Sequence, residues 1–253
     1  MNPQVFGWEH LTYLAVIIVL MVTSLVLIKL YVKSEKVKTI IIKSVAAVLL
    51  AMIVWNRISI AISTNSWLAL IPDSFCGMSS LVLSLACLIG KKDNAVLHFV
   101  FYIAIVGDFI TMIYPDFLDQ NPSFFYANTI SGLLHHTIGL YLCILILLLG
   151  YFKPNYKKWP SLLIGFMAYI TFGAFLMSVC GFDDAFCINK PILSGTPLTV
   201  WLLAVIFAVA YIIFFVIYEL VRKKINNKKL AEATTSNTQN NQPSQNDFTN
   251  TKE

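Results

Sequence analysis

The chain has 253 residues, of which 58% are hydrophobic and 12% are charged. Its mean hydropathy is +0.74, whereas a soluble domain carries about 25% charged residues, so the composition excludes an ordinary soluble protein. The net charge of +5 comes largely from Lys and Arg between the apolar runs and near the C-terminus. This favours a membrane orientation signal over a nucleic-acid surface. The sequence therefore predicts an all-α, polytopic protein of the cell membrane, surrounded by lipid and without a nucleic-acid partner.

Seven apolar runs are long enough to cross a bilayer, which takes about 20 residues of helix. In chain order they are Leu11–Tyr31, Thr39–Ser63, Leu68–Gly90, Ala95–Tyr114, Asn128–Gly150, Trp159–Cys180 and Leu198–Leu220. Short connections make neighbouring spans antiparallel. The first run is expected to remain as a span, because no basic region precedes it and no small-residue cleavage site follows it.

Lys and Arg mark alternate connections between these runs. The first, third and fifth connections and the segment after the last span are basic, whereas the second and fourth contain no Lys or Arg. The sixth has Asp183 and Asp184 against Lys190. By the positive-inside rule, the N-terminus is expected outside and the C-terminus in the cytoplasm. Residues 1–225 are expected to form the transmembrane domain. Residues 226–253, dominated by small polar side chains, are expected to form a disordered cytoplasmic tail.

Ionisable residues inside spans are costly and mark candidate sites. Counted at 1.5 Å per residue, Cys76 and His136 lie roughly 12 Å from the outer ends of their helices, and Arg57 and Asp108 roughly 8–10 Å. Asp73 precedes Cys76 by three residues and is expected on the same helix face. His98 and Glu219 lie toward the cytoplasmic side, outside this group. The predicted outer group is His10, Arg57, Asp73, Cys76, Asp108, His135 and His136.

A thiol beside a histidine has the parts that covalent acyl transfer needs. The thiolate is the reactive form, the histidine takes its proton, and a carboxylate can orient the histidine. Structural readings stand beside this one. Buried Cys often only packs, a membrane His often only bonds between helices, and an Arg–Asp pair can simply neutralise itself.

Metal and cofactor sites are not predicted. His135 and His136 are adjacent, so on a helix their side chains are expected to diverge by ~100°. Cys180 and Cys187 flank a short connection, where they either form a disulfide or remain as two reduced thiols.

Scattered motifs resemble the YwaF-like family of integral membrane proteins. The matching elements are Phe6-Gly-Trp-Glu-His10, Pro72 with Cys76, Asn94 followed by Tyr114-Pro115-Asp116, His136 with Tyr141, Phe152-Lys-Pro154 and Trp159, and Lys190-Pro191. Asp73 departs from the family pattern, which has Leu there, and Asp183-Asp184 replaces Asn-Tyr. The offset to Pro154 favours His136 over His135.

The resemblance implies phospholipid acyltransferase activity, which has been attached to eukaryotic relatives with a Cys and a His as catalytic residues. These positions carry over onto Cys76 and His136. The expected function is a lipid acyltransferase or acyl hydrolase acting on a phospholipid or acyl-lipid, with Asp108 or Asp73 orienting the histidine and Arg57 holding a phosphate. Two alternatives stay open. One is a transporter or permease with Asp108 in a proton path, and the other is a sensor without catalysis.

Overall fold

The computed structural model describes residues 3–192 and 195–240, and these are helical, with no strand among them. The elements are α1 (Trp8–Tyr31), α2 (Glu35–Thr64), the 3-10 turn η1 (Trp67–Leu70), α3 (Phe75–Leu88), α4 (Leu97–Ile113), α5 (Ala127–Leu148), the 3-10 turn η2 (Tyr156–Lys158), α6 (Trp159–Val179) and α7 (Val200–Asn240). The predicted all-helical fold is confirmed.

Five of these helical stretches are long and apolar enough to cross a membrane. They are α1, α2, α5, Tyr156–Val179 and Val200–Asn227. The remaining two apolar helices are shorter, with 14 residues in α3 and 17 in α4. At 1.5 Å per residue these span about 21 and 26 Å, against about 30 Å of hydrocarbon. The polytopic membrane fold is confirmed, but the predicted third span, Leu68–Gly90, is not one continuous helix.

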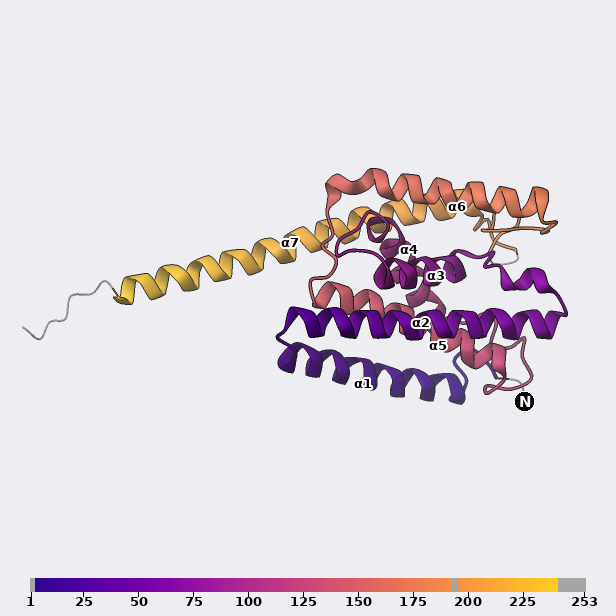
Figure 1. Ribbon diagram of the computed structural model, residues 1–253, viewed down its shortest axis with the longest axis horizontal. Coiled ribbons are helices and arrows are strands. Elements are labelled where there is room, and N and C mark those ends of the chain that lie inside the picture. The colour runs from indigo at the N-terminus through magenta and orange to yellow at the C-terminus, as the bar shows by residue number, and fades with distance from the viewer. Residues whose placement is uncertain (1–2, 193–194, 241–253) are drawn as a thin grey trace, which may run out of the picture. The chain divides into compact units, whose positions relative to one another are not determined.

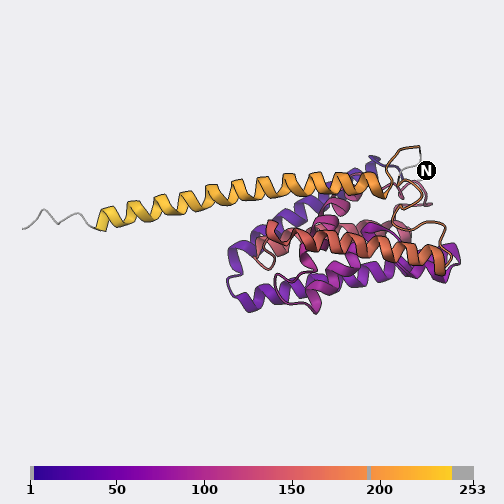
Figure 2. The ribbon, with the colours of Figure 1, turned by 90° about the horizontal axis from the view of Figure 1, so that it is seen from above.

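The chain divides into two units, residues 1–208 and 209–253. In the first unit α2 packs against α3 and α5, while α4 packs against α3, α5 and α6. Helices α1 and α2 run antiparallel in Figure 1, and α6, uppermost there, lies nearest the viewer in Figure 2. Helix α5 is the central helix of this unit, since 67% of its most apolar 18-residue stretch is buried, whereas the corresponding value for α1 is 0%. The site is therefore built around α5, and α1 is left to face lipid.

The second unit contains the C-terminal part of α7. This helix continues to Asn240, over residues where the sequence predicts a disordered tail starting at 226. Residues 241–253 of that predicted tail lie outside the described residues. The tail and its boundary at residue 226 stay predictions.

The end of the first unit that carries the connections 65–74 and 114–126 and residues 180–192 is here called the outer end, after the orientation predicted from Lys and Arg. The opposite end is the inner end. At the inner end Asp93 joins the α3–α4 connection to the α5–α6 connection. Its Oδ1 accepts from Lys153 N at 3.0 Å and lies 3.0 Å from His98 Nε2, and its Oδ2 accepts from Lys158 Nζ at 3.2 Å. The Asp93 backbone N–H donates to Tyr151 O at 3.1 Å. The backbone of Asp93 is left-handed, with φ 55°.

Replacing Asp93 should destabilise the fold in a pH-dependent way. Burial acts to raise the pKa of Asp93, but the Lys153 N–H, Lys158 and His98 outweigh it and hold this pKa below its ordinary value of 3.8. A lowered folded pKa means that the stabilisation is present above pH 3.8 and is lost as pH falls through the folded pKa. Because the Asp93 side chain is 35% exposed, screening limits the effect to about 1 kcal/mol.

The measurement is thermal unfolding in detergent of wild type, Asp93→Asn and Asp93→Ala. Asn tolerates the left-handed backbone and keeps one acceptor, so Asp93→Asn isolates the charge. Its deficit should shrink below pH 3.8, whereas Asp93→Ala should stay destabilised at every pH. An Asp93→Asn deficit that does not change with pH would contradict the charge as the cause.

Candidate functional site

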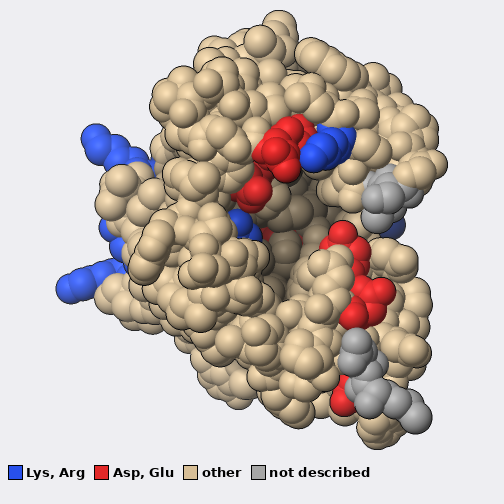
Figure 3. All heavy atoms as spheres, turned by 90° about the vertical axis from the view of Figure 1, so that its right-hand side faces the viewer, with Lys and Arg blue, Asp and Glu red and all other residues tan. Residues whose placement is uncertain are grey.

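A cavity of about 620 Å³ lies in the outer half of the first unit. Figure 3 looks onto the outer end and shows the surface hollowed there, with acidic side chains around the hollow. The cavity wall draws polar side chains from α2, α3, α4 and α5. Among the residues that line it are Asn56, Arg57, Cys76, Thr111, Asn128, His135 and His136. Four of the seven predicted site residues therefore meet in one cavity.

The start of α3 places Cys76 in that wall. Pro72 disfavours helical backbone in the residue before it, and Ile71 is extended with ψ 124°. Ser74 then caps the helix, because its Oγ accepts from Gly77 N at 3.2 Å. Helix α3 therefore begins at Phe75, with Cys76 as its second residue. The prediction that Cys76 lies partway down a continuous helix, with Asp73 on the same helix face, is wrong, since Asp73 precedes the helix.

His136 is held by Asp108, as one of the sequence-based alternatives expected. His136 Nδ1 lies 2.8 Å from Asp108 Oδ1, and the two residues are 5% and 1% exposed. The Asp108 carboxylate reaches α5 because residue 139 is glycine. A Cβ at Gly139 would overlap Asp108 Oδ2 and lie 2.9 Å from Asp108 Cγ. When the Asp108 carboxylate is ionised it can only accept, so Nδ1 donates to it and His136 Nε2 is the nitrogen with a lone pair.

Cys76 lies against α4, the helix that also carries Asp108, the partner of His136. Its Sγ is 3.9 Å from Thr111 Oγ1, and a Cβ at Gly107 would lie 3.1 Å from the same sulfur. Within the described residues the thiol and His136 share the cavity but make no hydrogen bond to each other. Helix α4 thus seats both groups, with Gly107 leaving room for the thiol and Asp108 binding the imidazole.

Arg57 is the basic group of the cavity wall. Its Nη1 lies 3.4 Å from Asp73 Oδ1, and its Nη2 donates to Asn56 Oδ1 at 3.2 Å. The Asp73 side chain is 42% exposed, whereas that of Arg57 is 14% exposed. The pairing is long for a salt bridge, and Asp73 is open to solvent, so its charge holds Arg57 only weakly.

His135 faces the same cavity as its neighbour. The ring centroids of His135 and His136 are 3.9 Å apart, and both residues line the cavity. The prediction that the two side chains diverge is therefore wrong. The 100° rotation applies to the Cα–Cβ bonds, and side-chain torsions bring the rings back together.

His10 lies apart from the cavity lining. Its Nδ1 accepts from Phe6 N at 3.2 Å, and its Nε2 lies 3.0 Å from Met112 O. It is 0% exposed, so it fastens the start of α1 to the end of α4. Cys180 and Cys187 are both free thiols in the structure. Burial first, and Asp184 and Asp73 next, raise the pKa of Cys187 to about 11.

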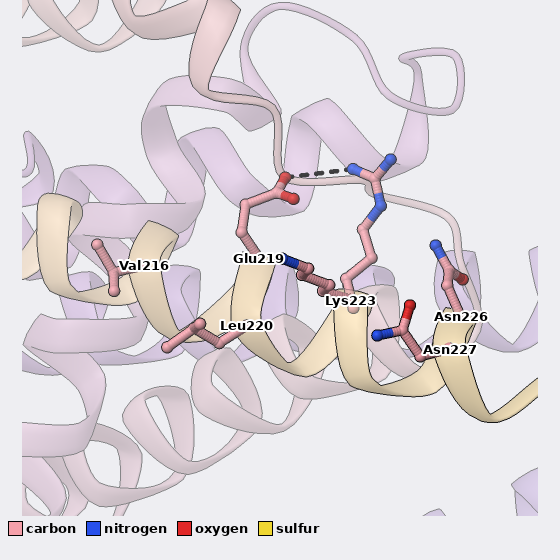
Figure 4. A pocket seen from close by; sticks show the side chains of 7 residues that line it. Val216, Glu219, Leu220, Lys223, Asn226 and Asn227 are labelled. Atoms are coloured by element: carbon pink, nitrogen blue, oxygen red, sulfur yellow. Dashed lines mark hydrogen bonds and ion pairs between the residues drawn. The ribbon is translucent and has the colours of Figure 1, made fainter.

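A shallow hollow in the second unit is a feature of one helix surface (Figure 4). Its lining residues are Val216, Glu219, Leu220, Arg222, Lys223, Asn226 and Asn227, all on α7. Glu219 Oε1 pairs with Arg222 Nη1 at 3.2 Å. This hollow lacks the buried polar groups of the outer cavity, and we do not assign a site to it.

Residues 5–230 match the family model of the TMEM164 family. The chain belongs to this family of membrane proteins. The matched residues include every residue that lines the outer cavity, so the cavity lies within the TMEM164 family match. The resemblance to YwaF-like proteins stays an expectation. Neither the curated proteins nor the solved structures contain a match.

Sequence reasoning missed the uncharged part of the site. Asn56, Thr111 and Asn128 line the cavity, and the glycines at 107 and 139 make room for its reactive groups. A search for ionisable residues passes over all five. A signal was present, because Asn56 and Thr111 are polar residues within apolar runs and lie within three positions of Arg57 and Asp108.

Proposed function

We propose that this TMEM164-family chain is a lipid acyltransferase or acyl hydrolase of the cell membrane that forms an acyl thioester on Cys76. The observation that carries the proposal is that Cys76 and the Asp108-bound His136 open on one cavity of about 620 Å³. A nucleophile, a base and a group that orients the base are the three parts of covalent acyl transfer. Apo sites often hold nucleophile and base beyond hydrogen-bond distance until substrate binds.

In the first step His136 Nε2 takes the thiol proton, directly or through one water. Cys76 Sγ attacks the ester carbonyl carbon of an acyl-lipid, and the carbon–sulfur bond forms as the carbon–oxygen ester bond breaks. The leaving lipid oxygen takes the proton from His136. The products are an acyl-Cys76 thioester and a deacylated lipid, so atoms and charge balance.

The backbone N–H groups at the start of α3 would stabilise the oxyanion that forms during this attack. Ser74 satisfies the amides of Gly77 and Met78. The amides of Phe75 and Cys76 belong to the first turn of the helix, where N–H groups have no acceptor within the helix itself. Backbone N–H groups directed at developing negative charge are the usual means of stabilising an acyl-transfer transition state. Arg57 would hold the phosphate of a phospholipid substrate.

The test is to find the acyl group on the protein. Purified protein in nanodiscs containing isotope-labelled diacyl phospholipid is quenched in acid, and its intact mass is measured. Wild type should gain one labelled acyl group that hydroxylamine removes, and Cys76→Ala should gain none. Cys87→Ala is the matched control, because Cys87 lies on the same helix, is 0% exposed and does not line the cavity. Labelling that persists in Cys76→Ala would refute the assignment of the nucleophile.

A further inference from the structure

His135 is a buried histidine, and one of its two ring nitrogens has no hydrogen-bond partner among the described residues. It is 3% exposed, and its Nδ1 lies 3.3 Å from the carbonyl oxygen of Ser131. A carbonyl oxygen only accepts, so Nδ1 carries the proton and donates it. Nε2 therefore holds a lone pair, and it makes no hydrogen bond within the part of the chain that the structure describes. A buried acceptor without a donor is uncommon in folded proteins and calls for an explanation.

Arg57 presents the complementary group on the same wall. Its Nε–H is also buried and has no partner among the described residues. Arg57 and His135 belong to one hydrogen-bond network. Arg57 Nη2 donates to Asn56 Oδ1, and Asn56 Nδ2 donates to Ser131 Oγ at 3.1 Å. His135 then donates to the Ser131 carbonyl. A donor and an acceptor are thus both unmet along one connected wall of the cavity.

A hydroxyl group has the donor and the acceptor that these two atoms need. Its oxygen accepts from Arg57 Nε–H, and its proton is donated to His135 Nε2. A phosphate oxygen or an ionised carboxylate only accepts, so it would leave the His135 lone pair unmet. The pair of unmet groups is therefore complementary to an alcohol or to water.

We propose that His135 and Arg57 form the acceptor side of the cavity, where an alcohol or water is activated to take the acyl group from Cys76. His135 is then a second catalytic base, a role that rests on the acyl transfer proposed above. The acceptor oxygen attacks the thioester carbonyl carbon, the carbon–oxygen bond forms, and the carbon–sulfur bond breaks. The hydroxyl proton moves to His135 Nε2, which returns it to the Cys76 thiolate. The enzyme ends in its starting state.

In this proposal each of the two adjacent histidines is the base for one half-reaction. His136 is held by Asp108 and serves the thiol, whereas His135 is held by Ser131 and serves the acceptor. With ring centroids 3.9 Å apart, both act on one acyl group without moving it. Neither ring has to turn between the steps, because each Nδ1 stays bonded to its own partner.

The experiment separates the half-reactions in nanodiscs, with a labelled short-chain diacyl phospholipid as donor and glycerol as the alcohol. His135→Asn keeps an amide nitrogen near the position of Nδ1 and removes the base. We expect Cys76 to be acylated within about threefold of the wild-type rate, while transfer to glycerol and water slows about 10²-fold or more. Acyl-Cys76 should then accumulate. Hydroxylamine, a nucleophile that needs no base, should release the acyl group from wild type and His135→Asn equally fast.

Two further results decide the outcome. Arg57→Lys removes the Nε donor and should raise the KM for glycerol about tenfold, the usual effect of losing one hydrogen bond to a charged group. Should His135→Asn not fold, His135→Gln is judged by the same two rates. Equal loss of acylation and release, or release at the wild-type rate, would overturn the role of His135. Absence of acyl-Cys76 in wild type would instead overturn the acyl transfer itself, and with it this role.

Discussion

His136→Gln should slow the acylation of Cys76 by about 10²–10⁴-fold, the usual contribution of a general base. Glutamine places an amide nitrogen near the position of Nε2 but cannot take a proton. Asp108→Asn should slow the same step by about 10²-fold or more, because an amide neither holds the Nδ1–H tautomer nor stabilises the imidazolium that forms. The measurement is the single-turnover rate of acyl-Cys76 formation followed by mass spectrometry.

The pH dependence of the acylation rate distinguishes loss of the general base from damage to the fold. Without His136 the thiol must ionise by itself, so the rate in His136→Gln should rise about tenfold for each pH unit below the thiol pKa. Wild type should reach a plateau, because the base is already supplied. His98→Gln, at the inner end, is a matched control that should keep the wild-type rate. A His136→Gln protein with the wild-type rate would exclude His136 as the base.

Gly139→Ala should destabilise the protein by about 1–3 kcal/mol, the usual cost of overpacking a core, and should also slow the acylation of Cys76. The added Cβ would overlap Asp108 Oδ2, so the carboxylate has to move away from α5, where it binds His136. Stability is measured by thermal unfolding or by denaturant in detergent.

A double-mutant cycle identifies the contact responsible. In an Asp108→Ala background the overlapping atoms are gone. Gly139→Ala should then lower the free energy of unfolding by less than about 0.5 kcal/mol, because the effects of mutations at two residues in contact are not additive. Gly165→Ala is the matched control. Its Cβ would overlap the Phe99 ring on α4, and its cost should be the same in both backgrounds. Equal costs for Gly139→Ala in the two backgrounds would show that the carboxylate does not fill the space beside Gly139.

The fold was largely predictable because a bilayer imposes length and composition on each span. Apolar runs were sufficient to locate the helices, although the break before α3 was missed. The signals for that break were local: Pro72 disfavours helix before it, and Ser74 is a good N-cap. Both were hidden within a run that is apolar enough to read as one span. Length alone therefore misjudged Leu68–Gly90.

The site was predictable only in part. Counting residues from the helix ends grouped Cys76 with His136, although the count for Cys76 assumed a continuous helix, whereas α3 begins only at Phe75. Which atoms touch depends on how α4 and α5 are rotated against each other, and one sequence does not encode that rotation directly. The sequence left open whether Asp73 or Asp108 serves His136. In the structure Gly139 decides this by admitting Asp108 to α5.

The shortness of α3 also bears on the proposed reaction, because it sets the depth of Cys76 in the bilayer. Fourteen residues cover about 21 Å, so with the inner end of α3 at one hydrocarbon boundary, Cys76 begins about 9 Å inside the other. On the outer side of Cys76 the chain is not part of a spanning helix, because η1 and residues 71–74 connect α2 to α3 there. A glycerolipid carries its ester carbonyls just beneath its headgroup. In the proposed reaction, the acyl chain therefore stays among the hydrocarbon tails while the ester reaches the thiol, so the lipid need not leave the bilayer.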